Sequence, residues 1–90
     1  MTAIADIARR TQHVVVAHNG EDKEFSYEKD ELVRELLAKA IAAFGIVNGP
    51  HLFGLFTLAG QELPDDKTLH DAKVHPGEKL LLRQSTVRGG

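Results

Sequence analysis

The amino-acid sequence predicts an α+β fold in which one helix packs across one face of a mixed sheet of four to five strands. Three observations predict it: a hairpin signal near the start, an apolar stripe at helical spacing in the middle, and alternating apolar residues near the end. A right-handed crossover after the hairpin would place the last strand beside the first. The 90 residues suffice for one domain with one modest core.

The expected hairpin opens the domain. Residues 14–17 are rich in valine, and the Asn19-Gly20 pair that follows tolerates positive φ at both positions of a tight turn. Residues 24–28 then alternate between polar and apolar side chains. This alternation places Phe25 and Tyr27 on the buried face of the second strand.

The expected helix follows, with Asp30 as its N-cap and its end at Phe44. Its apolar residues recur at steps of three and four and form one stripe that must cover the sheet: Leu32, Val33, Leu36, Leu37, Ala40, Ile41 and Phe44. Gly45 then occupies the position where a left-handed residue ends a helix, and Ile46 can contact the last turn.

A third strand is expected over residues 51–58. In this strand Phe56 and Leu58 would face the helix, and Leu55 and Thr57 would face solvent. A turn then leads into a very short fourth strand that ends near Leu63.

The last strand is reached through a polar loop over residues 64–76, in which Leu69 and Val74 are apolar anchors. The Pro76-Gly77 pair favours a type II turn into this strand. Within it we expect Leu80 and Leu82 to point inward and Leu81 and Arg83 to point outward.

These elements divide the chain into a flexible extension over residues 1–12, a domain over 13–84 and an exposed tail over 85–90. The tail ends at Gly89-Gly90. Because glycine loses more backbone entropy than any other residue when it is ordered, a terminal diglycine adds little to folding. It indicates a thin, extended end of the chain to which a partner can bind.

Composition excludes several classes of protein. No cysteine is present, so the chain has no disulfide, no thiolate metal site and no thiol nucleophile. A formal charge of -2 offers no basic field for nucleic acid, and no apolar run is long enough to span a membrane. The five histidines lack metal-ligand spacing. We therefore expect a cytoplasmic protein that is not an enzyme and carries no cofactor.

Several short motifs resemble ubiquitin over residues 13–90. Leu-Ala-Gly-Gln-Glu-Leu at 58–63, Lys-Thr-Leu-His-Asp at 67–71, the leucines at 80–82 and Val-Arg-Gly-Gly at 87–90 occur in ubiquitin's order with matching spacing, although the tail is one residue longer. Gly45-Ile46 matches the end of its helix. The resemblance implies a β-grasp fold.

The resemblance also implies a protein modifier. The Gly90 carboxylate would be adenylated, carried as a thioester on partner cysteines and joined to amines of target proteins through an isopeptide bond, with Thr86, Val87, Arg88 and Gly89 recognised in the tail. The implied partners are an ATP-dependent activating enzyme, a conjugating enzyme, a deconjugating peptidase and the targets. The divergence from ubiquitin suggests a bacterial relative. A β-grasp sulfur carrier with a C-terminal thiocarboxylate, or a non-conjugated binding module, is the alternative.

The expected partner-binding surface is the outward face of the sheet, formed by Leu55, Thr57, Leu81 and Arg83. The positions that correspond to ubiquitin's apolar recognition patch are polar here: the His18-Asn19 turn, Thr57 and Arg83. Proteins that bind this patch of ubiquitin should therefore bind this chain poorly. Exposed leucines on the same face can seed a different partner site. The equally weighted alternative is that Ile4 and Ile7 of the N-terminal extension cover those leucines.

Overall fold

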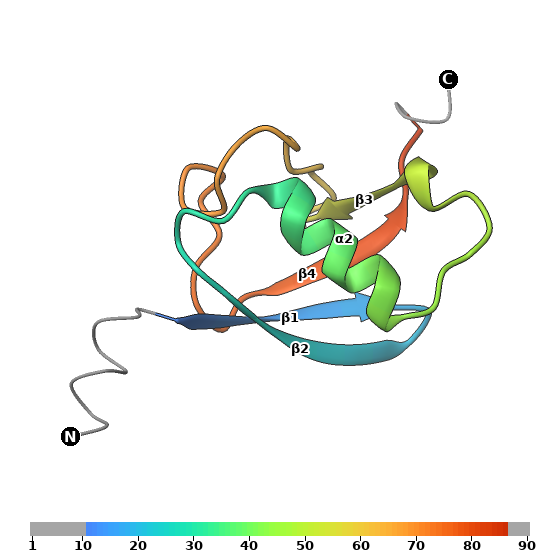
Figure 1. Cartoon of the computed structure of the whole chain (residues 1–90), viewed down its shortest axis with the longest axis horizontal. Helices are drawn as coiled ribbons and strands as arrows, with labels where there is room; N and C mark the ends of the chain where they lie inside the picture. The colour runs from blue at the N-terminus through green and yellow to red at the C-terminus, as the bar shows by residue number, and fades with distance from the viewer. Residues whose placement is uncertain (1–10, 87–90) are drawn as a thin grey trace.

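The computed structural model describes residues 11–86, which form a four-stranded sheet with one helix across one face (Figure 1). The elements are β1 Gln12–His18, β2 Glu21–Tyr27, α2 Val33–Ala43, the 3-10 helix η1 Pro50–Leu52, β3 Phe53–Phe56 and β4 Lys79–Gln84. The strand order is β2-β1-β4-β3, with β1 parallel to β4 and the other neighbours antiparallel. The predicted fold class is confirmed, and the last strand does lie beside the first.

The hairpin forms at the Asn19-Gly20 pair, as predicted. Both residues have positive φ, at 56° and 82°, and His18 pairs with Glu21 across the turn. Two consecutive left-handed residues match the right-handed twist of the flanking strands. Tyr27 is buried and Phe25 packs against the core, so the predicted facing of β2 is also confirmed.

The start of the helix lies later than the sequence suggested, and Asp30 is not its N-cap. Leu32 precedes the first helical residue, and its amide donates to Oε1 of Glu35 at 2.9 Å. The amide of Val33 donates to the carbonyl oxygen of Lys67 at 2.9 Å. Carbonyl groups of the 64–68 segment thus accept hydrogen bonds from amides at the start of the helix. A capping side chain usually accepts these bonds. Because this segment is distant in sequence, local capping rules could not identify it.

The helix ends as predicted. Gly45 has φ of 68°, and the amide of Ile46 donates to the carbonyl oxygen of Ile41 at 3.1 Å. This six-to-one bond with a left-handed residue inside it is the geometry that closes many helices.

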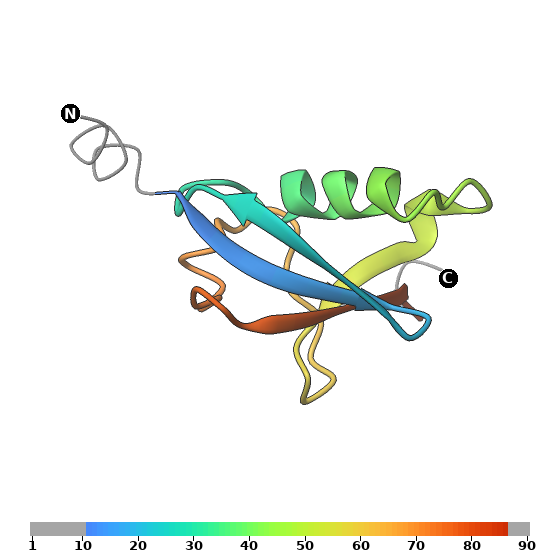
Figure 2. The same cartoon turned by 90° about the horizontal axis from the view of Figure 1, so that it is seen from below.

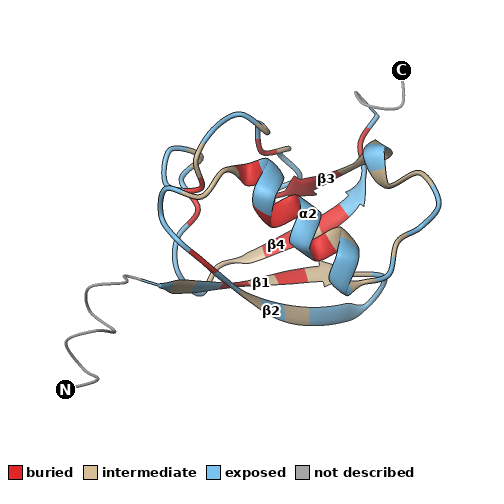
Figure 3. Cartoon of the chain, in the orientation of Figure 1, coloured by how far each residue is buried: buried red, intermediate tan, exposed pale blue. Residues whose placement is uncertain are grey.

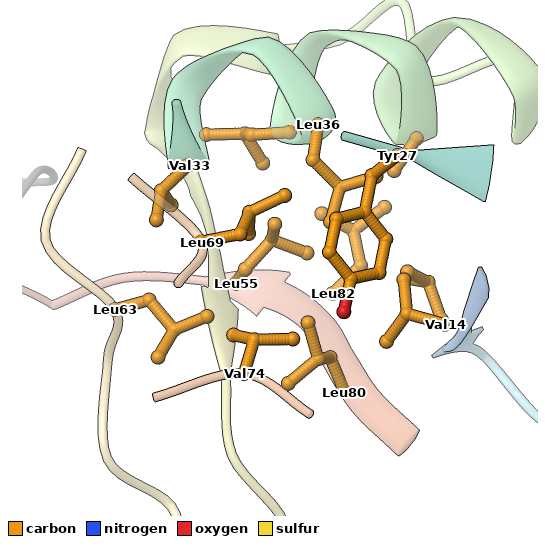
Figure 4. Packing of buried hydrophobic residues seen from close by; sticks show 13 residues of the cluster. Val14, Tyr27, Val33, Leu36, Leu55, Leu63, Leu69, Val74, Leu80 and Leu82 are labelled. Carbon is orange, nitrogen blue, oxygen red and sulfur yellow. The ribbon is translucent and has the colours of Figure 1, made fainter. Parts of the chain in front are cut away.

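The core lies between α2 and the sheet (Figure 3), and within residues 11–86 no helix lies on the opposite face of the sheet (Figure 2). Its buried members come from every layer and from the 63–74 segment (Figure 4): Val14, Val16, Tyr27, Val33, Leu36, Leu37, Ala40, Leu55, Leu63, Leu69, Val74, Leu80 and Leu82. The predicted anchors Leu69 and Val74 are among them. The predicted fourth strand is reduced to an isolated bridge between Phe56 and Glu62.

The turn before β4 also has its predicted form. Gly77 has φ of 82°, and the amide of Glu78 donates to the carbonyl oxygen of His75 at 3.1 Å. In β4 the side chains of Leu80 and Leu82 are buried, at 0% and 2% exposed. Within residues 11–86, no helix has the length and apolar character needed to cross a membrane.

Candidate partner-binding surface

The face of the sheet opposite α2, here called the outer face, is where the sequence placed a partner surface. Its composition depends on the register between β3 and β4. In that register Leu55 pairs with Leu82, and Phe56 pairs with Leu81. Directly paired residues share a face of the sheet. Because Leu82 is buried beneath the helix, Leu55 is buried with it, and Phe56 lies on the outer face.

The predicted facing of β3 is therefore wrong. Leu55, expected on the surface, is 0% exposed and belongs to the core, whereas Leu58, expected inside, is 64% exposed. The physical reason is that β3 ends at Phe56, and residues 57–62 form a turn that projects from the outer face (Figure 2). The alternation in the sequence predicted a strand that continues through that turn. Because β3 is apolar on both faces, the sequence does not indicate which face is buried.

Thr57 belongs to this turn rather than to an open surface. Its amide donates to the carbonyl oxygen of Gln61 at 2.9 Å, and its Oγ1 accepts from the amide of Gln61 at 3.2 Å. Its polar groups therefore stabilise the turn locally. The outer-face position beside Leu81 belongs to Phe56, so the face expected to be polar at Thr57 carries an aromatic ring.

Phe56 is the functional candidate that sequence reasoning missed. The guanidinium carbon of Arg83 lies 4.3 Å from the centre of the Phe56 ring, and Phe56 is 7% exposed. A methyl group built on Gly60 would lie 3.8 Å from Nη2 of Arg83, so the turn also borders this guanidinium. The facing of Phe56 follows from the pairing of its neighbour Leu55 with Leu82. That pairing cannot be known from the sequence, because it depends on the register of the two strands.

The structure thus brings together an outer-face patch, defined as Ala17, Phe56, Leu81 and Arg83. Ala17 pairs with Leu81 across the parallel β1–β4 junction, and Leu81 pairs with Phe56. Arg83 is exposed as predicted, whereas Leu81, predicted to be an exposed leucine, is half-buried. The patch combines apolar side chains with Arg83, and arginine is among the residues enriched at binding hot spots.

The His18 side chain is not part of this patch. Its Nδ1 lies 3.0 Å from the carbonyl oxygen of Leu82, and its ring packs edge-on against Phe44 and Phe53 at centroid distances of 5.3 and 5.8 Å. These contacts hold the ring against the end of α2, on the inner side of the sheet. Asn19, in contrast, is exposed in the hairpin turn.

The first residue of the expected C-terminal tail, Ser85, is held against the domain and is here called the tail root. Ser85 is 3% exposed; its amide donates to the carbonyl oxygen of Leu52 at 2.8 Å and its Oγ donates to Oε1 of Glu62 at 2.7 Å. The packed part of the chain therefore extends one residue beyond the expected boundary at 84. Thr86 is exposed. The other predicted tail residues, Val87, Arg88, Gly89 and Gly90, lie outside the described residues.

Tyr27 is a buried ionisable residue within residues 11–86. Burial, and to a smaller extent the Glu78 carboxylate, raises the pKa of Tyr27. Its hydroxyl is buried without a hydrogen-bond partner in the described structure. No group of three or more His, Asp or Glu side chains in this part of the chain is arranged to hold a metal ion.

Comparison with known proteins supports the fold. No protein-family model and no curated protein matches the sequence. Among solved structures, a designed protein described as based on ubiquitin is similar, with a TM-score of 0.73 and 20% identity. The match covers 86% of this chain and 92% of that chain. At this identity the likeness concerns the fold alone, and with the helix packed on a mixed sheet it shows that the chain has the ubiquitin-like β-grasp fold.

Proposed function

We propose that this chain is a ubiquitin-like protein modifier that is attached to target proteins through the carboxylate of Gly90. The observation that carries the proposal is the Gly89-Gly90 pair placed shortly after β4 on a ubiquitin-like fold. Glycines allow the backbone to pass through a channel too narrow for side chains. The carboxylate would be free either because Gly90 is the last encoded residue or because a peptidase exposes it.

The chemistry follows from a carboxylate that must be activated. A Gly90 carboxylate oxygen attacks the α-phosphorus of ATP, which forms an acyl adenylate and releases pyrophosphate. A cysteine thiolate of the activating enzyme then displaces AMP and forms a thioester. A target amine finally attacks the thioester carbonyl, loses a proton and releases the thiol. Because the chain has no cysteine, every thiol in this sequence of steps belongs to a partner.

The anchored tail root supports this role. Ser85 bonds to Leu52 and Glu62, so the chain is held at a fixed point directly before the expected recognition residues of the tail. A fixed origin reduces the conformational entropy that a partner must remove when it orders the tail. The tail thus combines a rigid start with a thin end.

We propose further that the activating enzyme grips the outer-face patch while the tail enters its active site. β4 carries both Leu81 and Arg83 of the patch and leads directly into the tail, so a partner on this face also lies near the tail root. Phe56 takes the place in this surface that Leu55 was expected to fill. Phe56 is 7% exposed and lies beneath the Arg83 guanidinium, so it supports Arg83 while Arg83 and the half-buried Leu81 offer the contact surface. Arginine is among the residues enriched at binding hot spots.

Incubation with the cognate activating enzyme and ATP tests the proposal. Wild type should form a thioester adduct that thiols reverse, and deletion of Gly90 should abolish it. An adduct that persists after this deletion would refute the proposal. A product whose mass shows one oxygen replaced by sulfur would instead identify a sulfur carrier.

The patch is tested in the same assay with matched substitutions. Leu81→Asp should weaken adduct formation at least about tenfold, the change that loss of about 1.4 kcal/mol of binding produces. Val47→Asp is the control, since Val47 is apolar, 81% exposed and lies in the loop after α2, away from the outer face. Equal activity of the two variants would show that the activating enzyme does not use the patch. It would not contradict the proposal that the Gly90 carboxylate is the reactive group.

A further inference from the structure

A pocket lies at the end of the domain remote from the tail root, between the segment after β2 and the 70–76 segment. Its volume is about 530 Å3, within the range of small-molecule sites. Its polar lining residues are Gln12, Lys29, His70, Lys73 and His75, and Val74 and Pro76 are apolar parts of the wall. The sequence showed these histidines only as scattered residues.

The charge of this pocket is opposite to that of the whole chain, whose formal charge is -2. Three lysines are held in ion pairs with carboxylates: Lys23 with Glu21, Lys39 with Glu31 and Lys79 with Asp22. Among the described residues, Lys29, Lys67 and Lys73 have no such pair, and of these Lys29 and Lys73 line the pocket. Their ammonium groups are therefore available to a ligand. Concave surfaces lined by one sign of charge attract the opposite ion most strongly.

The walls are held by backbone bonds. The amide of His70 donates to the carbonyl oxygen of Lys29 at 3.3 Å, and the amide of Lys73 donates to that of His70 at 3.0 Å. The Nδ1 of His75 lies 3.2 Å from the Lys73 carbonyl oxygen. The residues of the pocket are thus connected to each other before any ligand arrives, which lowers the entropic cost of binding.

Lys73 itself has φ of 68°, in the left-handed region where lysine is uncommon. Its conformation ends the turn over residues 68–72, since the amide of Val74 donates to the carbonyl oxygen of Leu69 at 3.0 Å. Asparagine tolerates this conformation better than lysine. The position therefore permits a substitution that removes the charge without straining the backbone.

We propose that this pocket binds a phosphate monoester. Two unpaired ammonium groups suit a dianionic phosphoryl group, for which lysine is a common ligand. His70 adds its ring nitrogens and His75 adds Nε2, because Nδ1 of His75 faces the Lys73 carbonyl oxygen. The apolar wall of Val74 and Pro76 can contact the organic part of the ester. The Glu78 carboxylate accepts from the amide of His75 at 2.9 Å, and its Oε1 lies 4.0 Å from Nδ1 of His75, so this negative charge lies beside His75 but not among the residues that line the pocket. This site is separate from the modifier proposal, and neither depends on the other.

The probe is AMP, titrated into the isotope-labelled full chain and followed by the amide resonances of His70, Lys73 and His75. We expect saturable shifts with AMP and none with adenosine, which lacks the phosphate. Lys73→Asn should weaken AMP binding at least tenfold, whereas Lys67→Asn, a matched loss of one exposed charge outside the pocket, should change it less than twofold. Thermal unfolding of both variants verifies that they fold.

Phosphoserine distinguishes the source of the phosphate. If it binds as tightly as AMP, the pocket recognises the phosphoryl group itself, as a modified side chain would present it; if AMP binds at least tenfold tighter, a nucleotide is favoured. Both outcomes support the site. Absence of saturation with both compounds, equal binding of adenosine, or equal weakening by Lys67→Asn and Lys73→Asn would overturn it.

Discussion

Truncation of Leu55 and of Leu58 tests the register of β3, because the sequence pattern and the structure predict opposite results. Leu55 is 0% exposed, and a buried Leu→Ala change costs about 2–5 kcal/mol through lost transfer free energy and the remaining cavity. Leu58 is 64% exposed, and surface substitutions usually change stability by less than about 0.5 kcal/mol. Leu55→Ala should therefore be destabilising and Leu58→Ala nearly neutral.

Thermal unfolding followed by far-ultraviolet circular dichroism measures the difference. For a domain of this size, 1 kcal/mol corresponds to about 4–8 °C, so Leu55→Ala should lower Tm by at least about 8 °C. Urea titration of the same variants gives the free energies of unfolding directly. If Leu58→Ala costs more than Leu55→Ala, then Leu58 is the core residue. The β3–β4 register described above would be wrong, and Phe56 would leave the outer-face patch.

Two further predictions concern Tyr27 and Gly45. The raised pKa of Tyr27 means that the folded state holds its proton more tightly, so this stability is complete below the unfolded pKa of about 10 and is lost as the pH rises through the folded value. Tyr27 is the only tyrosine, so tyrosinate absorbance reports it alone, and Tyr27→Phe should remove the alkaline loss while costing little at neutral pH; ionisation at an ordinary pKa in the folded protein would contradict this. Gly45→Ala should cost about 1 kcal/mol in urea titration from the left-handed φ alone, since a methyl group there meets nothing within 4 Å, and an unchanged free energy of unfolding would show that the helix end adjusts without strain.

Local patterns determined much of this fold. The Asn19-Gly20 turn, the left-handed Gly45 and the Pro76-Gly77 turn depend on the φ preferences of a few adjacent residues, and all three form as predicted. The sequence correctly predicted that Leu80 and Leu82 point toward the core, because β4 is regular and the polar Arg83 lies on its outer face.

Only the tertiary structure decided the features that depend on distant partners. The start of α2 depends on carbonyl groups of the 64–68 segment, and the facing of Leu55 and Phe56 depends on their pairing with β4. A short strand that is apolar on both faces has no preferred side until a neighbour fixes its register. The pocket with Lys29 and Lys73 likewise joins segments more than forty residues apart, and only the folded chain brings their charges together.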